Sequence, residues 1–421
     1  MTRSDEYDVI VIGGGPAGSS TATMVAQGGH SVLLLELEKF PRFRIGESLM
    51  PATYWTLDRM GVLDKMNCSQ FPQKHSVQFF SKSGRGSVPF YFSETEPGPS
   101  AQTWQVDRGE FDLMLLNNAR EKGVEVFEET RVTEVLFDGD RAVGVAARFP
   151  DGEIREIAAT VVVDASGQAA MLGHKLRLRQ GDENLRNCSY YTRYKNAWRG
   201  EGRDEGATLI LYTGEPRTWF WYIPLPEGDV SVGVVGPIER LTEGRRDPQA
   251  VFDSEAASCP AILERIEGAE QLHPVRALKD FTYSCRQMAG DGWILVGDAF
   301  GFIDPIYSSG VFLAMKGGEF AADSILAALD SDDVSGVRLG AHAEEYAEGV
   351  EAMRKLVYAY YAPEFNFAKF LEQYPDVKDE LVNLLIGNVY RKSVTRLLES
   401  MEQFCELPGY EPFRIEEAAA N

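Results

Sequence analysis

The N-terminal pattern of apolar runs and glycines predicts a parallel sheet with a helix packed against it. Residues 7–12 (YDVIVI) and 31–36 (SVLLLE) are short continuous apolar runs, typical of strands that are buried on both faces. Glycines at 13–18 predict a turn between them, and the pattern from 16 to 28 predicts a helix. The order strand, helix, strand predicts a βαβ unit, the beginning of a nucleotide-binding α/β fold.

The rest of the chain changes character twice. Further strands are predicted at 123–127, 131–137, 141–148, 159–163 and 293–296, and further helices at 107–122 and 310–329. From 188 to 236 the chain is rich in Tyr, Trp, Val and Thr with short turns, which predicts an antiparallel sheet. Residues 341–400 have a mostly helical pattern with many aromatic side chains. Because the later strand at 293–296 returns to the first pattern, the sheet-rich middle is predicted to be an insertion.

We therefore divide the chain into three parts. A discontinuous nucleotide-binding domain is predicted at 1–70, 101–180 and 281–335. A substrate domain is predicted at 71–100 and 181–280, followed by a C-terminal helical region at 336–421. Within that region, the aromatic stretch 358–370 either caps a substrate cavity or packs on the core.

Composition excludes several classes of function. The 421-residue chain has a net charge of −22 and a pI of about 4.7, so its surface repels phosphate backbones and no nucleic-acid partner is expected. No apolar run is long enough to span a membrane, and no signal peptide is recognisable. The five cysteines and five histidines have no metal-ligand spacing. We expect a cytoplasmic protein with reduced thiols and no metal site.

The first turn has the spacing of a dinucleotide-binding motif. In Gly13-x-Gly15-x-x-Gly18, the first glycine permits the tight turn, the second lets the backbone approach a pyrophosphate, and the third allows close helix packing. Glu36 ends the second predicted strand, where its carboxylate can accept hydrogen bonds from ribose hydroxyls. This motif does not separate FAD from NAD.

Two later segments resemble the FAD-dependent aromatic hydroxylase superfamily. These are residues 105–112 (QVDRGEFD), which open a predicted helix, and 293–299 (WILVGDA), which end a strand. The resemblance implies that Asp298 holds the ribityl chain and that Arg108 lies along FAD. It also places Ala17, Val132 and Val311 beside the cofactor. Without it, Arg108 would be a surface ion pair and Asp298 a helix N-cap, and the 164–167 segment (DASG) would be merely a turn.

Residues 40–51 (FPRFRIGESLMP) narrow the resemblance. They are similar to the segment that follows the second strand in flavin-dependent halogenases and in geranylgeranyl-reductase-like flavoproteins. In those families the segment runs beside the flavin. The resemblance therefore makes Arg44, Ile45 and Ser48 candidate FAD contacts.

Residues 219–224 (WFWYIP) match the WxWxIP motif of flavin-dependent halogenases at every fixed position. The resemblance implies that Trp219, Trp221, Ile223 and Pro224 lie near the flavin and keep the substrate away from it. Two indoles form a bulky wall of low flexibility. The alternative is an ordinary strand with aromatic side chains packed on a core.

Lys74 lies in a segment, 71–79 (FPQKHSVQF), that resembles the one carrying the active-site lysine of these halogenases. An ammonium at this position could hydrogen-bond and polarise hypohalous acid, whereas a free amine could form a haloamine. The sequence does not decide between these forms. A lysine before a strand is otherwise usually exposed.

The segment 302–311 (FIDPIYSSGV) resembles the halogenase loop that leads into the last helix of the FAD domain. By this resemblance Ser309 and Gly310 bind chloride or bromide, since backbone N–H groups at a helix start attract anions. A helix N-cap serine is the alternative. Tryptophan halogenases carry a glutamate where this chain has Tyr307, which favours a phenol or pyrrole substrate over indole.

The resemblance as a whole implies an α/β protein. Its parts are a Rossmann-like FAD-binding domain of the aromatic hydroxylase type, an inserted antiparallel-sheet substrate domain and a C-terminal helical region. The implied activity is halogenation of an electron-rich phenol or pyrrole with O₂, halide and reduced FAD. A separate flavin reductase would supply the FADH₂, because no second nucleotide-binding motif is visible. The alternatives are an aromatic hydroxylase, a geranylgeranyl-reductase-like oxidoreductase or a non-catalytic FAD-binding module. Whether a carrier protein presents the substrate stays open.

Overall fold

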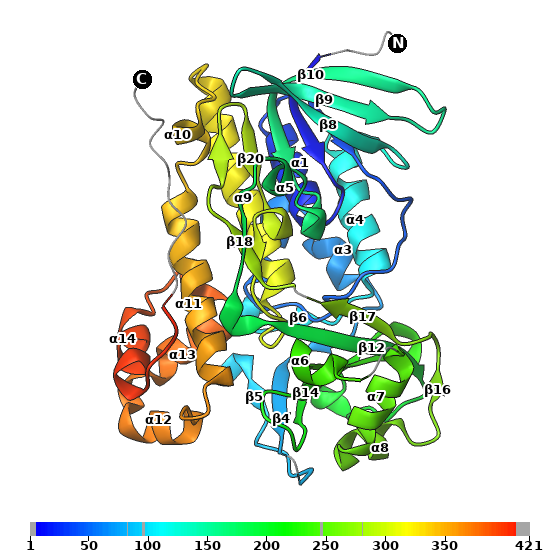
Figure 1. The fold of residues 1–421 in the computed structure, drawn as a ribbon, viewed down its shortest axis with the longest axis vertical. Coiled ribbons are helices and arrows are strands. Elements are labelled where there is room, and N and C mark those ends of the chain that lie inside the picture. Colours follow the sequence, from blue (N-terminus) through cyan, green and yellow to red (C-terminus); the bar gives the residue numbers. More distant parts are fainter. Residues whose placement is uncertain (1–5, 82, 95–96, 245–246, 280, 410–421) are drawn as a thin grey trace.

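The computed structural model describes residues 6–81, 83–94, 97–244, 247–279 and 281–409. Its first sheet has the strand order β19-β20-β10-β1-β2-β7, and β8 and β9 extend it from β10 (Figure 1). β20, β10, β1, β2 and β7 run parallel to one another. The strands are β1 (Glu6–Ile12), β2 (Val32–Leu35), β7 (Glu125–Phe127), β8 (Arg131–Asp138), β9 (Arg141–Arg148), β10 (Ile154–Asp164), β19 (Ala289–Gly290) and β20 (Trp293–Leu295). The predicted βαβ unit is confirmed.

Three long helices pack beside this sheet. β1 and β2 are apolar throughout their buried lengths, so helices must cover the sheet. α1 packs against both α9 and α4. The helices and their shorter neighbours are α1 (Pro16–Gln27), α2 (Thr53–Met60), α3 (Leu63–Asn67), α4 (Arg108–Glu121), α5 (Met171–Lys175) and α9 (Ser309–Asp330).

A second sheet has the order β16-β12-β15-β14-β13-β4-β5, and β17 also pairs with β12. The predicted antiparallel pairing holds for β12 to β15, whereas β4 joins β13 in parallel because it comes from a distant, earlier segment. The strands are β4 (Ser76–Phe80), β5 (Phe90–Tyr91), β12 (Asn187–Lys195), β13 (Thr208–Tyr212), β14 (Trp219–Pro224), β15 (Asp229–Pro237), β16 (Glu270–Gln271) and β17 (Arg276–Lys279).

Helices cover one face of the second sheet. α6 (Ile238–Thr242), α7 (Pro248–Ala257) and α8 (Pro260–Ile266) follow β15 and bury Phe220 and Tyr222 of β14. The sequence patterns did not predict these short helices. The other face of β14 joins a core that is shared with the first sheet.

Two smaller sheets complete the strands of the fold. β3 (Gln73–Lys74) pairs with β6 (Thr103–Trp104), and β11 (Arg179–Gly181), β18 (Tyr283–Cys285) and β21 (Gly301–Phe302) form a small third sheet. All strands of the second sheet fall within 71–100 and 181–280, so we retain the three-part division as a proposal.

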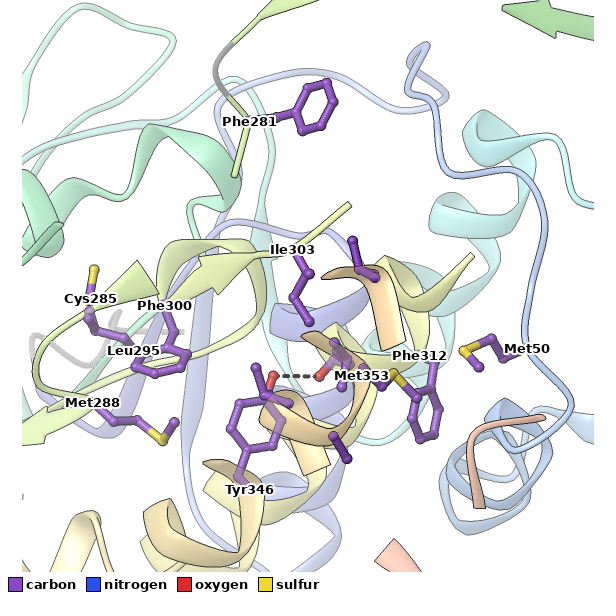
Figure 2. Packing of buried hydrophobic residues seen from close by; sticks show 14 of the residues in the cluster. Met50, Phe281, Cys285, Met288, Leu295, Phe300, Ile303, Phe312, Tyr346 and Met353 are labelled. Carbon is purple, nitrogen blue, oxygen red and sulfur yellow. Dashed lines mark hydrogen bonds between the residues drawn. The ribbon is translucent and has the colours of Figure 1, made fainter. Parts of the chain in front are cut away.

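The C-terminal helices run beside both lobes (Figure 1). They are α10 (Gly336–Leu339), α11 (Ala343–Tyr361), α12 (Phe367–Gln373), α13 (Lys378–Ile386) and α14 (Thr395–Phe404). Figure 2 shows Tyr346 and Met353 of α11 beside Phe312 of α9 in the largest core cluster. The Tyr346 hydroxyl donates a 3.1 Å hydrogen bond to the carbonyl of Leu313. The predicted helical region is confirmed, and α11 anchors it to the nucleotide-binding lobe.

No helix in the described ranges is long and apolar enough to cross a membrane.

Candidate active site

The glycine turn after β1 has the geometry that its sequence predicts. Gly13 has φ +103°, and a Cβ there would lie 2.4 Å from the carbonyl oxygen of Ala165. A Cβ on Gly18 would lie 1.9 Å from the Gly13 carbonyl oxygen. At Gly15, by contrast, the nearest atom is a guanidinium nitrogen of Arg42 at 3.6 Å. The start of α1 is therefore open on the side where a pyrophosphate would approach its N–H groups.

Glu36 fixes the same turn from the end of β2. Its buried carboxylate accepts hydrogen bonds from the Gly14 N–H at 2.7 Å and from the Glu38 N–H at 2.8 Å. A carboxylate has about four acceptor positions, so two remain for ribose hydroxyls. Val132 lies close by on β8, since the Thr130 N–H donates to the Glu36 carbonyl at 2.8 Å.

Arg108 is buried and is not the surface ion pair of the alternative interpretation. Its guanidinium donates to the Ile45 carbonyl at 2.6 Å and binds Asp112 through two nitrogens, at 2.8 and 2.9 Å. A Cβ on Gly46 would lie 2.7 Å from the same guanidinium and 3.5 Å from Val311. The predicted residues Ile45, Arg108 and Val311 are thus neighbours.

Asp298 belongs to a short 3-10 turn between β20 and α9, and Val296 rather than Asp298 is its N-cap. Burial raises the pKa of Asp298 to about 6, and the positive charge of Arg108 opposes this rise. Ala17 contacts the same turn, because a Cβ on Gly297 would lie 2.8 Å from the Ala17 methyl. The turn therefore joins the glycine motif to Arg108, as an FAD site requires.

Two candidate contacts differ from their neighbours in position. Arg44 is exposed and forms an ion pair with Glu38. Ser48 is buried, and its hydroxyl contacts Lys74 Nζ at 2.8 Å and the Thr208 hydroxyl at 2.8 Å. The structure therefore places the Ser48 side chain with the predicted catalytic lysine. Their roles as FAD contacts stay predictions.

Asp164 forms a turn that holds β10 to α5. Its buried carboxylate accepts the N–H groups of Ser166 at 3.0 Å and Leu172 at 2.7 Å. The 164–167 segment also supplies Ala165, whose carbonyl confines Gly13. The turn thus lies beside the glycine motif.

Lys74 is only 2% exposed, against the usual preference of lysine for solvent. Its Nζ donates to the Ser48 hydroxyl at 2.8 Å and to the Leu49 carbonyl at 3.0 Å. Desolvation lowers the pKa of Lys74 to about 7. At neutral pH the ammonium and the free amine therefore coexist. After these two hydrogen bonds are made, the ammonium keeps a third N–H to donate, and the free amine keeps its lone pair.

The WxWxIP residues form β14, and all six are buried. Trp219, Trp221 and Ile223 face the core that the second sheet shares with the first. The Trp221 indole nitrogen donates to the Ser231 hydroxyl at 3.1 Å, and the ring lies against Gly233, where a Cβ would be 2.2 Å away. These two contacts fix the Trp221 indole, and a hydrogen bond to Tyr361 fixes that of Trp219. Pro224 ends the strand, opposite Val230 of β15.

An aromatic row connects this motif to the segment beside Arg108. Tyr191 lies 5.9 Å from Trp221, and Phe43 stacks on Tyr191 at 6.3 Å between ring centroids. Trp219 lies 6.4 Å from Trp221 and 6.4 Å from Tyr360 of α11. The indoles therefore stand between the 40–51 segment and the end of α11.

The start of α9 is not capped by a serine side chain. Ser308 is the N-cap residue, with φ +58°, and its side chain makes no capping hydrogen bond. Ser309 is buried in the first turn and is followed by Gly310, where a Cβ would lie 2.8 Å from the Phe302 ring. The first backbone N–H groups of this 22-residue helix can therefore receive a halide.

Asp304 and Tyr361 form a buried cluster that the sequence patterns did not single out as functional. The Tyr361 hydroxyl donates to both carboxylate oxygens of Asp304 at 3.2 Å and accepts from the Trp219 indole at 2.9 Å. The Asn187 side chain and the Ile306 N–H also donate to Asp304, at 3.1 and 3.0 Å. Burial raises the pKa of Asp304 to about 6. The only sequence feature that could have indicated this cluster is the Asp304-Pro305 dipeptide within the predicted halide loop.

Glu47 and Arg193 are a second missed pair. The Arg193 guanidinium donates to Glu47 at 2.6 Å and to Asp107 at 2.7 Å. Burial raises the pKa of Glu47, and Arg193 opposes this rise. The pair ties β12 to the segment that carries Ser48. Sequence spacing gives no hint of it, since the partners are 146 positions apart.

Known proteins agree with this geometry. The model of the FAD binding domain family matches residues 6–345, which identifies a flavoprotein. The chain is 30% identical over 418 residues to the 1H-pyrrole-2-carbonyl-[peptidyl-carrier protein] chlorinase of Pseudomonas fluorescens, covering 94% of this chain and 93% of that protein. It is 32% identical over 390 residues to the corresponding brominase of Pseudoalteromonas luteoviolacea, covering 92% and 93%.

Among solved structures, the flavin-dependent brominase Bmp2 superposes with a TM-score of 0.85 at 31% identity, covering 95% of this chain and 99% of that one. The chain therefore belongs to the flavin-dependent halogenases. It is an enzyme with an aromatic-hydroxylase-type FAD fold.

Proposed function

We propose that this halogenase acts on a pyrrole or phenol ring tethered to a carrier protein, with Lys74 as the catalytic residue. The observation that carries the proposal is the burial of the Lys74 amine, which donates hydrogen bonds to Ser48 and Leu49 and whose pKa is lowered to about 7 by desolvation. A structural lysine normally exposes its amine, whereas an amine poised between two protonation states suits proton and halogen transfer.

The described residues fit FAD. The open side of Gly15, the Glu36 carboxylate and the Arg108–Asp298 pair would hold its pyrophosphate, ribose and ribityl groups. Reduced FAD, when bound, would supply two electrons and two protons, so that dioxygen, a halide ion and one further proton give hypohalous acid and water. The reduced cofactor would come from a flavin reductase.

The protein supplies position and exclusion. The N-terminus of α9 at Ser309 and Gly310 would hold chloride or bromide. The Trp219 and Trp221 indoles would keep the substrate ring from the cofactor. Lys74 would hold hypohalous acid against the ring, which takes the halogen and releases a proton as water forms from the oxidant.

A carrier-tethered substrate is favoured by the two relatives named above, which act on pyrrole-2-carbonyl groups on peptidyl carrier proteins. They match this chain over more than nine tenths of its length. Tyr307 is partly buried at the predicted halide loop, with its ring 6.0 Å from that of Tyr360. Aromatic side chains of this kind would suit contact with a small aromatic ring.

Lys74→Ala tests the proposal. The purified chain is assayed with a flavin reductase, NADH, chloride or bromide, and pyrrole and phenol substrates, free and as carrier thioesters. We expect product formation to fall by a factor of about 100 or more, while FAD binding is retained. Lys65→Ala, which removes an amine paired with Glu121 on the surface, is the matched control. Unchanged turnover in Lys74→Ala would remove this residue from the mechanism.

A further inference from the structure

A surface pocket is lined by Phe90, whose ring contacts Phe92 beside Lys74. It has a volume of about 700 Å³ and lies between the 88–94 segment, which contains β5, and helix α13 with the later Lys392 (Figure 1). Its lining residues are Val88, Pro89, Phe90, Glu94, Lys378, Asp379, Asn383 and Lys392. None of them belongs to the site described above.

One aromatic pair separates this pocket from the catalytic lysine. The Phe92 ring centroid is 5.6 Å from Lys74 Nζ, and the Phe90 ring, which lines the pocket, meets Phe92 edge-on at 6.1 Å. Phe92 packs on Val382 and Ile386 of α13. Phe90 and Phe92 thus form a continuous contact from the pocket to Nζ.

Helix α13 is also joined directly to the lysine's surroundings. The Ala52 N–H donates to the Ile386 carbonyl at 2.9 Å, three residues after Leu49, whose carbonyl receives Lys74. A ligand that binds α13 from the pocket side is therefore positioned relative to Lys74 by a rigid contact.

The pocket offers three kinds of contact. Lys378 and Lys392 present exposed cations at its rim, although the chain as a whole carries a charge of −22. Asn383 is only 7% exposed, and within the described part of the chain its side-chain oxygen has no hydrogen-bond donor. Val88 is 87% exposed and gives an apolar wall with Phe90.

A buried acceptor without a donor is unfavourable, and a ligand N–H at Asn383 would satisfy it. Glu94 and Asp379 also line the pocket. They disfavour a ligand that is anionic along its whole length. The combination suits an elongated neutral chain with amide groups, a branched apolar part and one terminal phosphate.

We propose that this pocket binds the 4′-phosphopantetheine arm that presents the aromatic acyl group. The phosphate lies at Lys378 and Lys392, an amide N–H of the arm donates to Asn383, and its dimethyl group packs on Val88 and Phe90. This inference rests on the proposed carrier-tethered substrate and adds the route by which the ring reaches Lys74. The same arm occurs in acyl coenzyme A, so both sources require a test.

Binding to the full-length chain is measured first, by calorimetry with 4′-phosphopantetheine, pantetheine and inorganic phosphate. We expect phosphopantetheine to bind about tenfold or more tightly than pantetheine, and added salt to reduce this difference. Lys378→Glu with Lys392→Glu should remove the preference, and Asn383→Leu should weaken both ligands. Lys369→Glu, an exposed charge reversal on neighbouring α12, should change neither.

Turnover measurements test the pocket assignment independently of the proposed function. The expected result is that Lys378→Glu with Lys392→Glu raises KM for acyl-carrier thioesters about tenfold or more, with kcat on a truncated thioester lacking phosphate unchanged. A preference for acyl-carrier over acyl-coenzyme A in the wild type identifies the source of the arm.

Wild-type activity on carrier thioesters that the double variant does not alter would overturn the pocket assignment alone. Activity restricted to free aromatic substrates would overturn the carrier-tethered substrate and the pocket together.

Discussion

The indole nitrogen of Trp219 donates a 2.9 Å hydrogen bond to the phenol oxygen of Tyr361. Tyr361 in turn donates to Asp304, which lies within the predicted halide loop. One hydroxyl thus joins β14, the end of α11 and the approach to α9. The position of the indole wall depends on the C-terminal helical region.

Tyr361→Phe should separate wall positioning from folding. The variant leaves the Trp219 N–H without its acceptor, which should lower the free energy of unfolding by about 1–3 kcal/mol. We also expect more hydrogen peroxide per halogenated product, because a displaced indole exposes the oxidant. The measurement is the ratio of peroxide to product.

Tyr358→Phe, on the same helix as Tyr361, is the matched control. It removes a hydroxyl that donates to Asp182 and not one that contacts Trp219. Equal peroxide ratios in the two variants would contradict a positioning role for Tyr361.

The three motif glycines should respond differently to alanine. Gly13→Ala and Gly18→Ala place a Cβ 2.4 and 1.9 Å from carbonyl oxygens, so both should lower stability and abolish FAD binding. Gly15→Ala has room for its Cβ and should keep the fold, while weakening FAD by crowding the pyrophosphate. Flavin titration and thermal unfolding distinguish these effects. Normal FAD binding by Gly15→Ala would show that the pyrophosphate does not lie against Gly15.

Removing Arg193 alone should destabilise the protein more than neutralising both members of the Glu47–Arg193 ion pair. Arg193→Met leaves a buried carboxylate without its cation and should lower the free energy of unfolding by about 3–5 kcal/mol. Adding Glu47→Gln should restore part of the loss, because the buried carboxylate is then neutral and only the partly exposed Asp107 lacks its cation. A double-mutant cycle from urea unfolding measures the coupling, and additive losses would exclude a direct pairing energy.

The rate of halogenation should change around pH 7. The pKa of Lys74 is lowered to about 7 by burial, so its protonation changes across the neutral range. A rate that falls as pH rises identifies the ammonium as the active form, and a rising rate identifies the amine. Lys74→Arg, which stays protonated, should lack this transition. A wild-type profile that is flat from pH 6 to 8 would contradict the assignment.

The Lys74 amine should also make the free energy of unfolding depend on pH. Because the folded-state pKa lies below the unfolded value, the unfolded chain binds more protons between about pH 7 and 10. Stability from Lys74 should therefore rise with pH in this window, by up to about 1.4 kcal/mol per pH unit. Lys74→Met should be stabilised relative to wild type more at pH 6 than at pH 9. Urea unfolding at both values measures the difference.

Local sequence patterns predicted the parts of the fold that local chemistry determines. The glycine turn, the strands around it and helices α1, α4 and α9 are recognisable because each has its own periodicity and end signals. The burial of β14 follows from six consecutive large or apolar residues.

Contacts between distant residues were not predictable in this way. Tyr361 meets Trp219 across 142 positions, and Arg193 meets Glu47 across 146, so no spacing rule relates them. The parallel pairing of β4 with β13 is equally non-local. Ser48 shows the same limit, since its contact with Lys74 depends on how two segments cross.

Strand β14 alternates between two environments, with Trp219 and Trp221 facing the shared core and Phe220 and Tyr222 buried under α7. A shift of one position in its pairing with β15 would exchange these sets. Oxidant confinement and folding therefore constrain the same six residues. Substitutions that change the substrate are therefore poorly tolerated in this strand.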